Sequence, residues 1–287
     1  MGDRRPAGRG RVILPHALRD WPRLRGRLVR ARAVILCDYD GTLAPLKRTP
    51  LLARMPAGTR RALAALHRPP RVIAGVVSGR SLASLCRFVA VPGLLYVGNH
   101  GWEISGAGMR YTAPGARRIK PLLASLSSRL HEALRGIPGA WVEPKGVSLS
   151  VHWREVAPGR TRAFRRAVDG VLGPWKRRGR IRVTQGKRVV EVRPPERWDK
   201  GRSIEWVMRR LRAGSGVALC YLGDDSTDEH AFRSVNRLGG MSVFVGAAGS
   251  PTRARWRLDG PADVRRFLAG IRREFIRAGV LPDEVSP

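Results

Sequence analysis

The sequence predicts an α/β fold, with a parallel sheet covered by helices on both faces and an α+β unit inserted into it. Apolar runs of strand length alternate with helical segments at both ends of the chain. Strands without polar alternation are typical of parallel sheets that are buried on both faces. Between these two stretches the pattern changes to alternating, half-exposed strands joined by turns that contain glycine.

The first part of the predicted parallel sheet comes from the first third of the chain. The apolar runs at 33–39, 71–79 and 94–99 are the expected strands, with helical segments between them. Pro56 suits the start of the first helix, because its fixed backbone angle is compatible with a helical N-terminus. The second helix is expected at 81–89.

A second unit is predicted inside this core. Two amphipathic helical stretches, at about 116–135 and 158–172, lie among strands of alternating polarity and give a β-α-β-β-α-β character. The parallel pattern then resumes, with helices expected from Asp199, Ser226 and Pro261. We therefore expect a basic N-terminal arm at 1–30 with one short helix at most, a core at 31–112 and 196–287, and an inserted domain at 113–195.

The charge balance is strongly basic. The 287 residues include 55 Lys and Arg but only 22 Asp and Glu, a formal net charge of +33, which suggests a nucleic acid or an anionic membrane as partner. The arginines are spread over almost every predicted helix, however, and only 6% of the residues are aromatic. A nucleic-acid surface gathers its cations on one face and interleaves them with stacking aromatics. We therefore expect no specific nucleic-acid partner.

The sequence also predicts a protein without a membrane partner. Its longest charge-free stretches are broken by glycine and proline before they reach the length that spans a bilayer. The three cysteines, Cys37, Cys86 and Cys220, are too few for a disulfide framework and predict free thiols in a cytoplasmic location. The oligomeric state is left open, with a monomer as the working expectation.

The scarce acidic residues cluster at two strand ends. Four of the 22 lie within residues 224–229, and Asp38 and Asp40 end the first strand. Ligands of open α/β sheets bind beyond the carboxyl ends of the strands, so both clusters are expected to face one crevice. Several carboxylates without a neighbouring His or Cys favour Mg²⁺, which beside a cationic pocket is typical of phosphoryl transfer. For Asp38 and Asp40 alone, a solvated turn is the alternative.

The chemistry of such a site can be divided between two aspartates. One can act as nucleophile and form an aspartyl-phosphate, and a second, two residues on, can protonate the leaving oxygen and then activate water. Gly41 would let backbone amides turn toward the phosphate oxygens.

Seven motifs resemble, in their order, those of the trehalose-6-phosphate phosphatases within the haloacid-dehalogenase-like hydrolases: DYDGTLAP, SGR, GNHGWE, VEPKGVSLSVHWR, GKRVVEVRP, WDKG and GDDSTDE. The resemblance covers roughly residues 33–246. It implies a Rossmann-like core and an inserted cap domain that closes over the sugar. It also implies a Mg²⁺-dependent phosphoric monoester hydrolase of trehalose biosynthesis, which converts its sugar-phosphate substrate, trehalose 6-phosphate, to trehalose and phosphate through an aspartyl-phosphate.

The resemblance assigns roles residue by residue. Asp38 would be the nucleophile, Asp40 the general acid and base, and Lys200 the cation that neutralises the phosphorylated aspartate. The implied Mg²⁺ ligands are Asp38, the backbone carbonyl of Asp40, and Asp224, with Asp228 as an additional residue. The implied phosphate and sugar contacts are Thr42, Ser78, Arg80, Asn99, His100, Glu143, Lys145, Arg154, Glu191 and Arg193.

Other interpretations stay open at this point. A capped sugar phosphatase or phosphomutase of the same superfamily, acting on sucrose-, mannosyl- or hexose-phosphates, shares the core motifs. An inactive phosphatase-like half of a fused synthase is a further interpretation, although all the motif carboxylates are present. Glu143 and Lys145 could form only an exposed ion pair of little energetic value. His100 could be structural, and Lys187 is expected in an exposed hairpin turn.

Overall fold

The larger of two sheets is centred on β1 (Arg32–Asp38) in the computed structural model, which describes residues 13–29, 32–47, 50–186, 188–213 and 216–283. On one side β1 pairs in parallel with β2 (Val72–Val77), which pairs with β3 (Leu95–Gly98). On its other side lie, all in parallel, β10 (Val217–Gly223), β11 (Met241–Val245) and β12 (Trp256–Leu258). The chain thus builds outward in both directions from β1, which places a topological switch point at its carboxyl end.

An antiparallel hairpin extends this sheet beyond β3. It consists of β4 (Glu103–Gly106) and β5 (Met109–Thr112), and it completes the eight-stranded order β12-β11-β10-β1-β2-β3-β4-β5. The parallel-dominated sheet with helices agrees with the predicted fold class. The sequence did not indicate β12, because three residues are too few to show a period.

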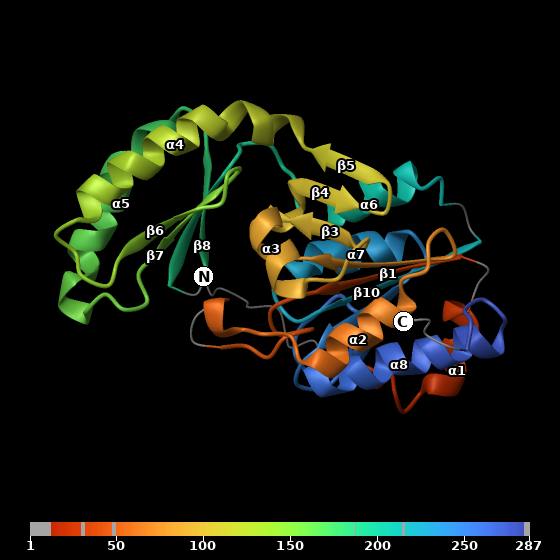
Figure 1. Cartoon of the computed structure of the whole chain (residues 1–287). Coiled ribbons are helices and arrows are strands. Elements are labelled where there is room, and N and C mark those ends of the chain that lie inside the picture. The colour runs from red at the N-terminus through yellow and green to blue at the C-terminus, as the bar shows by residue number, and fades with distance from the viewer. Residues whose placement is uncertain (1–12, 30–31, 48–49, 187, 214–215, 284–287) are drawn as a thin grey trace, which may run out of the picture.

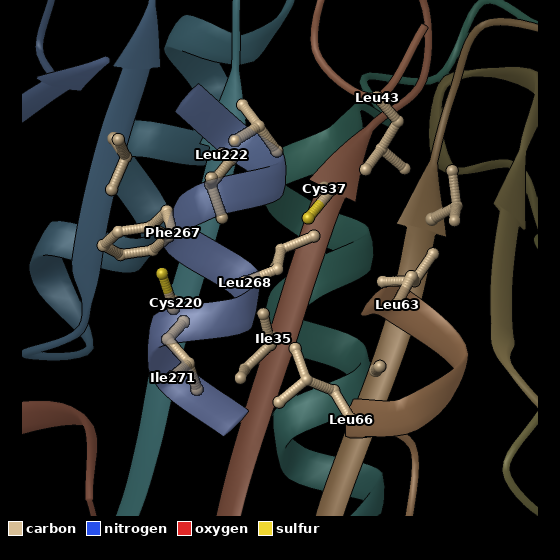
Figure 2. Packing of buried hydrophobic residues seen from close by; sticks show 14 of the residues in the cluster. Ile35, Cys37, Leu43, Leu63, Leu66, Cys220, Leu222, Phe267, Leu268 and Ile271 are labelled. Carbon is tan, nitrogen blue, oxygen red and sulfur yellow. The ribbon is translucent and has the colours of Figure 1, made fainter. Parts of the chain in front are cut away.

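Helices cover both faces of the larger sheet. Along β1, Ile35 and Cys37 point into one hydrophobic cluster, while Val34 and Leu36 point into the other. The Ile35 side packs against α1 (Trp21–Leu28), α2 (Ala57–Leu66), α3 (Leu82–Val89) and α8 (Pro261–Arg277). The Val34 side packs against α6 (Lys200–Arg210) and α7 (Asp228–Arg237). Figure 2 shows α8 and α2 side chains against β1 and β10 on the first of these faces.

The N-terminal segment contains α1, the one short helix that the prediction allowed. Leu24 and Leu28 of α1 are buried in the core, and Trp21 contacts Phe267 of α8 edge-on, with ring centroids 5.5 Å apart. Residues 13–29 therefore pack on the core, because an apolar stripe interrupts their many arginines. Residues 1–12 of the predicted arm lie outside the described part of the chain.

A smaller antiparallel sheet has the strand order β6-β7-β9-β8. Its strands are β6 (Trp141–Pro144), β7 (Leu149–His152), β8 (Arg182–Gly186) and β9 (Val189–Arg193), packed against α4 (Pro114–Leu134) and α5 (Thr161–Arg177). This unit has a hydrophobic core of its own, and Figure 1 shows it extending to one side of the larger sheet. The exact domain boundaries at 113 and 195 stay a prediction.

Short 3₁₀ turns at Pro50–Leu52, Asn99–Gly101 and Pro158–Arg160 complete the described elements. The last of these turns occupies the start of the helix predicted at 158–172, so α5 begins later than expected. It also ends later, at Arg177. All three cysteines are free thiols, two of them buried, as predicted. No helix among the described residues is long and apolar enough to cross a membrane.

Candidate active site

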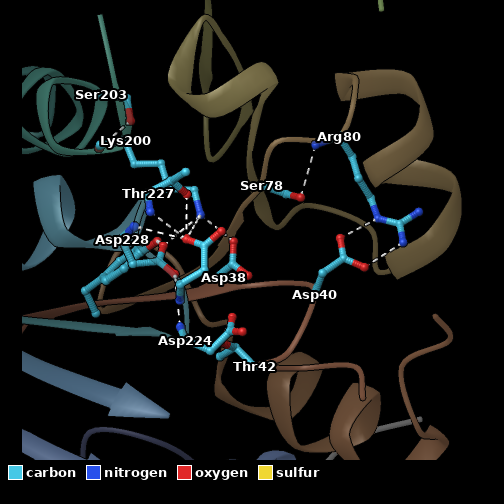
Figure 3. A network of polar contacts seen from close by, with 12 residues as sticks. Asp38, Asp40, Thr42, Ser78, Arg80, Lys200, Ser203, Asp224, Thr227 and Asp228 are labelled. Atoms are coloured by element: carbon cyan, nitrogen blue, oxygen red, sulfur yellow. Dashed lines mark hydrogen bonds and ion pairs between the residues drawn. The ribbon is translucent and has the colours of Figure 1, made fainter. Parts of the chain in front are cut away.

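The two acidic clusters meet at the carboxyl ends of β1 and β10, as the sequence predicted. Asp38 is the last residue of β1, and Asp224 directly follows β10. Side chains alternate along a strand, so Asp38 points to the same face as Val34 and Leu36. This is the face of α6 and α7, whose first residues are Lys200 and Asp228. The alternation of side chains along β1 and the positions at which α6 and α7 begin therefore bring four side chains together (Figure 3). They are Asp38, Lys200, Asp224 and Asp228.

Lys200 is the central cation of this group. Its ammonium donates one hydrogen bond to Asp38 Oδ1 and one to Asp228 Oδ1, and each bond is 2.7 Å long. The lysine side chain is only 2% exposed, and both carboxylates are buried. Removal of either partner of such a buried ion pair would leave an uncompensated buried charge.

Asp228 is held by four donors. Besides Lys200, the hydroxyl of Tyr221 donates to Asp228 Oδ1 over 2.6 Å, and the backbone N–H groups of Asp224 and Asp225 donate to Oδ2 over 3.0 and 3.1 Å. Tyr221 was missing from the predicted site. The signal was present, because it is the one strongly polar side chain in the apolar strand β10, on the face that leads to the acidic loop.

Burial and charge crowding shift the ionisation of the cluster. Burial, together with the charges of Asp228 and Asp225, raises the pKa of the Asp224 carboxyl to about 7. Burial also raises the pKa of Asp38, against the opposing attraction of Lys200. For Lys200, burial disfavours the ammonium form, but Asp228 and Asp38 outweigh it and raise the pKa of the amine well above its ordinary value. The site therefore carries excess negative charge that a further cation would relieve.

The carboxylates are arranged in a way that could hold a metal ion. Asp38, Asp224 and Asp228 each offer an oxygen, and these oxygens lie within 4.8 Å of one another. The hydroxyl of Thr42 donates to Asp224 Oδ1 over 3.3 Å and orients that carboxylate. An all-oxygen set of this kind fits a hard divalent cation.

Asp40 points away from this cluster. Its carboxylate accepts two hydrogen bonds from the guanidinium of Arg80, over 2.8 and 2.7 Å. The guanidinium also lies over the rings of Phe88 and Tyr39, 4.3 and 4.9 Å from their centroids. Ser78 is close by, and its hydroxyl accepts the backbone N–H of Arg80 over 3.2 Å. In Figure 3, Asp40 and Arg80 form a second group beside Asp38, next to the turn that holds Ser78.

The turn between Asp38 and Thr42 depends on a glycine. Gly41 has φ +91°, in the region that glycine adopts without strain. A Cβ at this position would lie 2.0 Å from Asp224 Oδ2. The absence of a side chain at Gly41 therefore lets the β10 loop approach the β1 loop.

Four of the predicted sugar-contacting residues come together on the smaller sheet. The ammonium of Lys145 lies 3.7 Å from Glu143 Oε2 and 3.5 Å from Glu191 Oε1, and Arg193 lies 3.9 Å from Glu191 Oε2. Because the Lys145 side chain is only 10% exposed, Glu143 and Lys145 do not form the exposed ion pair that was the alternative interpretation. Two residues that the sequence did not single out join the group, since His152 contacts Glu143 over 2.9 Å and Ser150 donates to Glu191 over 2.7 Å.

The smaller sheet contacts the larger unit through Asn99. The amide of Asn99 donates to the Lys145 backbone carbonyl over 3.0 Å and accepts from the Ser148 hydroxyl over 2.8 Å. Lys145 itself donates to the Gly79 carbonyl over 3.4 Å. These bonds bring the turn after β6 next to the turn that carries Ser78 and Arg80.

His100 lies between the acidic cluster around Lys200 and the charged residues Lys145 and Arg193 of the smaller unit. Its ring packs against Gly79, where a Cβ would lie 2.4 Å from it. Burial, and then the charges of Arg193, Lys200 and Lys145, lower the pKa of His100 well below its ordinary value. The imidazole is therefore neutral, and its buried Nδ1 has no hydrogen-bond partner in the described part of the chain.

The remaining candidates are less central. Arg154 lies in the exposed turn after β7. Asp225 accepts hydrogen bonds from Thr227 and from the N–H of Asp228, so its carboxylate stabilises the loop, and it lies 4.0 Å from the Lys200 ammonium. Lys187 is outside the described residues.

Comparison with known families supports the motif assignment. A family model described as trehalose-phosphatase matches residues 36–262. A curated trehalose-phosphate phosphatase of Mycobacterium avium is 37% identical over 241 residues, which make up 81% of this chain and 60% of that protein. The chain therefore spans about three fifths of the length of this relative.

Solved structures show the same fold. The C-terminal domain of C. albicans trehalose-6-phosphate phosphatase matches with a TM-score of 0.74 at 24% identity, over 90% of this chain and 98% of that one. A haloacid dehalogenase-like hydrolase from Bacteroides thetaiotaomicron matches with a TM-score of 0.55 at 16% identity, over 84% and 99% of the two chains. These likenesses confirm the predicted haloacid-dehalogenase-like fold.

Proposed function

The chain belongs to the trehalose-phosphatase family, and from this membership we propose that it hydrolyses trehalose 6-phosphate to trehalose and phosphate. The observation that carries the proposal is the buried group of Asp38, Asp228 and Lys200 at the switch point of the sheet. This group combines a carboxylate nucleophile with a cation held at 2.7 Å from it.

Asp38 would attack the phosphorus atom and take up the phosphoryl group as an aspartyl-phosphate, while the sugar oxygen leaves. The ammonium of Lys200 already contacts Asp38, so it is placed to neutralise the charge that the phosphoryl group brings. Tyr221 and two backbone N–H groups hold Asp228, which in turn fixes the lysine. Water then hydrolyses the aspartyl-phosphate and restores Asp38.

Asp40, after taking up a proton from solvent, would give it to the leaving sugar oxygen and later take one from the attacking water. For this step its carboxylate has to leave the guanidinium of Arg80, to which it is bound through two hydrogen bonds. The substrate phosphate is a competing anion for this guanidinium. We propose that phosphate binding at Arg80 and Ser78 releases Asp40 toward the leaving oxygen.

We also propose that the metal held here is Mg²⁺. Asp38, Asp224 and Asp228 would hold it, with Thr42 orienting Asp224. The fit rests on three oxygens within 4.8 Å of one another and on the raised pKa of Asp224, which reflects crowded negative charge. When bound, the ion supplies charge neutralisation for the phosphoryl oxygens.

The α4–β9 unit, residues 114–193, would act as a cap that binds the sugar. Glu143, Lys145 and Glu191 present alternating charges that can accept and donate hydrogen bonds with sugar hydroxyls. The turn after β6 reaches Asn99 and Gly79 of the core, so the phosphate and sugar groups of one substrate can be bound at the same time. The free thiols support a cytoplasmic location.

Phosphate release from a panel of sugar phosphates tests this function. Trehalose 6-phosphate is expected to exceed sucrose, mannosyl and hexose phosphates in kcat/KM by tenfold or more. Asp38→Asn is expected to abolish Mg²⁺-dependent release while circular dichroism stays unchanged. A tenfold preference for another sugar phosphate, or turnover by the variant, would falsify the proposal.

A further inference from the structure

A second cluster of metal-ligand side chains lies where the N-terminal segment meets the connection between β12 and α8. His16 precedes α1, Asp259 follows β12, and Asp263 lies in the first turn of α8. One ligand atom of each residue lies within 4.8 Å of those of the other two. None of these residues takes part in the proposed phosphatase site.

The backbone fixes the position of His16. The residue pairs in parallel with Arg257 of β12, where the N–H of Ala17 donates to the Arg257 carbonyl over 2.9 Å and the N–H of Arg257 donates to the Pro15 carbonyl over 3.0 Å. The histidine is thus held at the sheet edge, with its ring directed toward the two aspartates.

The imidazole of His16 is buried, and neither of its ring nitrogens meets hydrogen-bond geometry with another described residue. Its side chain is 7% exposed, and Nε2 lies 3.3 Å from Asp259 Oδ2 and 3.3 Å from Asp263 Oδ2. Nε2 nevertheless makes no hydrogen bond with either oxygen, and Nδ1 has no partner among the described residues. The ring nitrogen therefore faces the region between the two oxygens, and a buried polar atom of this kind needs an explanation.

The two nitrogen–oxygen distances match those between ligands of a tetrahedral ion. Bonds of about 2.1 Å from a zinc ion to nitrogen and oxygen place neighbouring ligand atoms about 3.4 Å apart. The other carboxylate oxygens have separate partners, since Arg257 donates to Asp259 Oδ1 and Arg266 donates to Asp263 Oδ1 over 3.5 Å. The N–H of Asp259 also donates to Asp263 Oδ2 over 3.3 Å. Such bonds orient ligating carboxylates in metal sites.

We propose that His16, Asp259 and Asp263 form a Zn²⁺ site that fastens the N-terminal segment to the edge of the larger sheet. An imidazole with two carboxylates favours Zn²⁺, whereas the all-oxygen set at Asp38 favours Mg²⁺. Asp259 is 58% exposed, which leaves access for a water molecule as the fourth ligand. Arg257 and Arg266 offset part of the carboxylate charge, so binding rests mainly on coordination of the three side-chain atoms.

A protonated His16 that only forms ion pairs with both aspartates is the competing explanation, and it predicts no Zn²⁺ binding. The test uses the untagged full chain carrying Asp38→Asn and Asp224→Asn, which disable the other metal site. After EDTA treatment and reloading, this parent is expected to retain about one Zn²⁺ per chain by elemental analysis and to show a higher Tm with Zn²⁺.

Adding His16→Gln is expected to remove both the bound Zn²⁺ and the rise in Tm. His131→Gln, on the exposed surface of α4, is the matched control and is expected to change neither. Asp259→Asn, at an exposed position, is expected to lower Zn²⁺ affinity at least tenfold and covers the case in which His16→Gln fails to fold. Failure of the parent to bind Zn²⁺, or undiminished binding by the folded variants, overturns the proposal.

Discussion

The guanidinium of Arg80 binds the carboxylate of Asp40 through two hydrogen bonds, from Nε over 2.8 Å and from Nη2 over 2.7 Å. The proposed phosphate ligand and the proposed general acid are thus paired with each other in the structure. Arg80→Lys keeps the charge but removes the planar pair of donors. We expect kcat/KM to fall about 10- to 100-fold, in proportion to one charged hydrogen bond. Steady-state kinetics would show this, and an unchanged value would argue against a phosphate contact.

Lys200→Met is expected to destabilise the protein as well as inactivate it. Two buried carboxylates lose their shared cation, a change that costs about 3–5 kcal/mol in comparable ion pairs. Because a bound Mg²⁺ would compensate the same carboxylates, we expect added Mg²⁺ to recover part of the loss. Urea unfolding with and without MgCl₂ measures both effects. Lys176→Met, on the exposed surface of α5, is the control, and a Mg²⁺-independent loss would contradict the shared site.

Lys145→Ala separates sugar recognition from phosphate chemistry. Lys145 contacts two carboxylates of the smaller sheet and does not contact Asp38 or Asp228 in the described structure. We therefore expect the KM of the Lys145→Ala variant for trehalose 6-phosphate to rise about tenfold or more, the equivalent of about 1.4 kcal/mol. Turnover of p-nitrophenyl phosphate, which has no sugar, should change less than about twofold, as should both activities of the exposed control Lys120→Ala. Equal losses on both substrates would contradict a sugar-binding role.

Gly41→Ala tests the close approach of the two acidic loops. The new Cβ would lie 2.0 Å from Asp224 Oδ2 and would force that carboxylate to move. We expect at least a tenfold loss of activity and a higher Mg²⁺ requirement, measured by titrating MgCl₂ in the phosphate-release assay. Gly108→Ala is the matched control, because Gly108 also has a positive φ, +73°, but a Cβ at that position would meet no atom of the described residues within 4 Å beyond its chain neighbours. Equal effects of both substitutions would refute the importance of the loop approach.

His67 is expected to make stability depend on pH. Its Nδ1 accepts the N–H of Ala74 over 3.2 Å, and burial lowers the pKa of the ring below 6.5. The unfolded chain therefore takes up a proton at a higher pH than the folded protein. Stability from His67 is present above about pH 6.5 and is lost as the pH falls toward the folded-state pKa. Urea midpoints from about pH 8 to about pH 5.5 should fall more steeply for the wild type than for His67→Gln. Parallel slopes would exclude this effect.

Local sequence patterns predicted much of the parallel core, because buried strands and amphipathic helices leave a period that can be counted. β1 and β2 lie within the runs predicted for them, apart from the first residue of β1. The three residues of β12 were missed, since a strand this short is defined by its neighbour β11. The packing of residues 13–29 on the core was not predicted, because their arginines concealed the two leucines that α1 buries.

The sequence by itself determined the family and the candidate site residues, since Asp38, Asp224 and Lys200 stand in motifs whose residue types and order are specific. Only the tertiary structure decided which of them touch. It paired Asp40 with Arg80, added Tyr221 to the support of Asp228, and brought His16 to a position beside Asp259 and Asp263. The physical reason is that most of these contacts join residues far apart along the chain. Their distances depend on strand order and helix packing, which local patterns do not record.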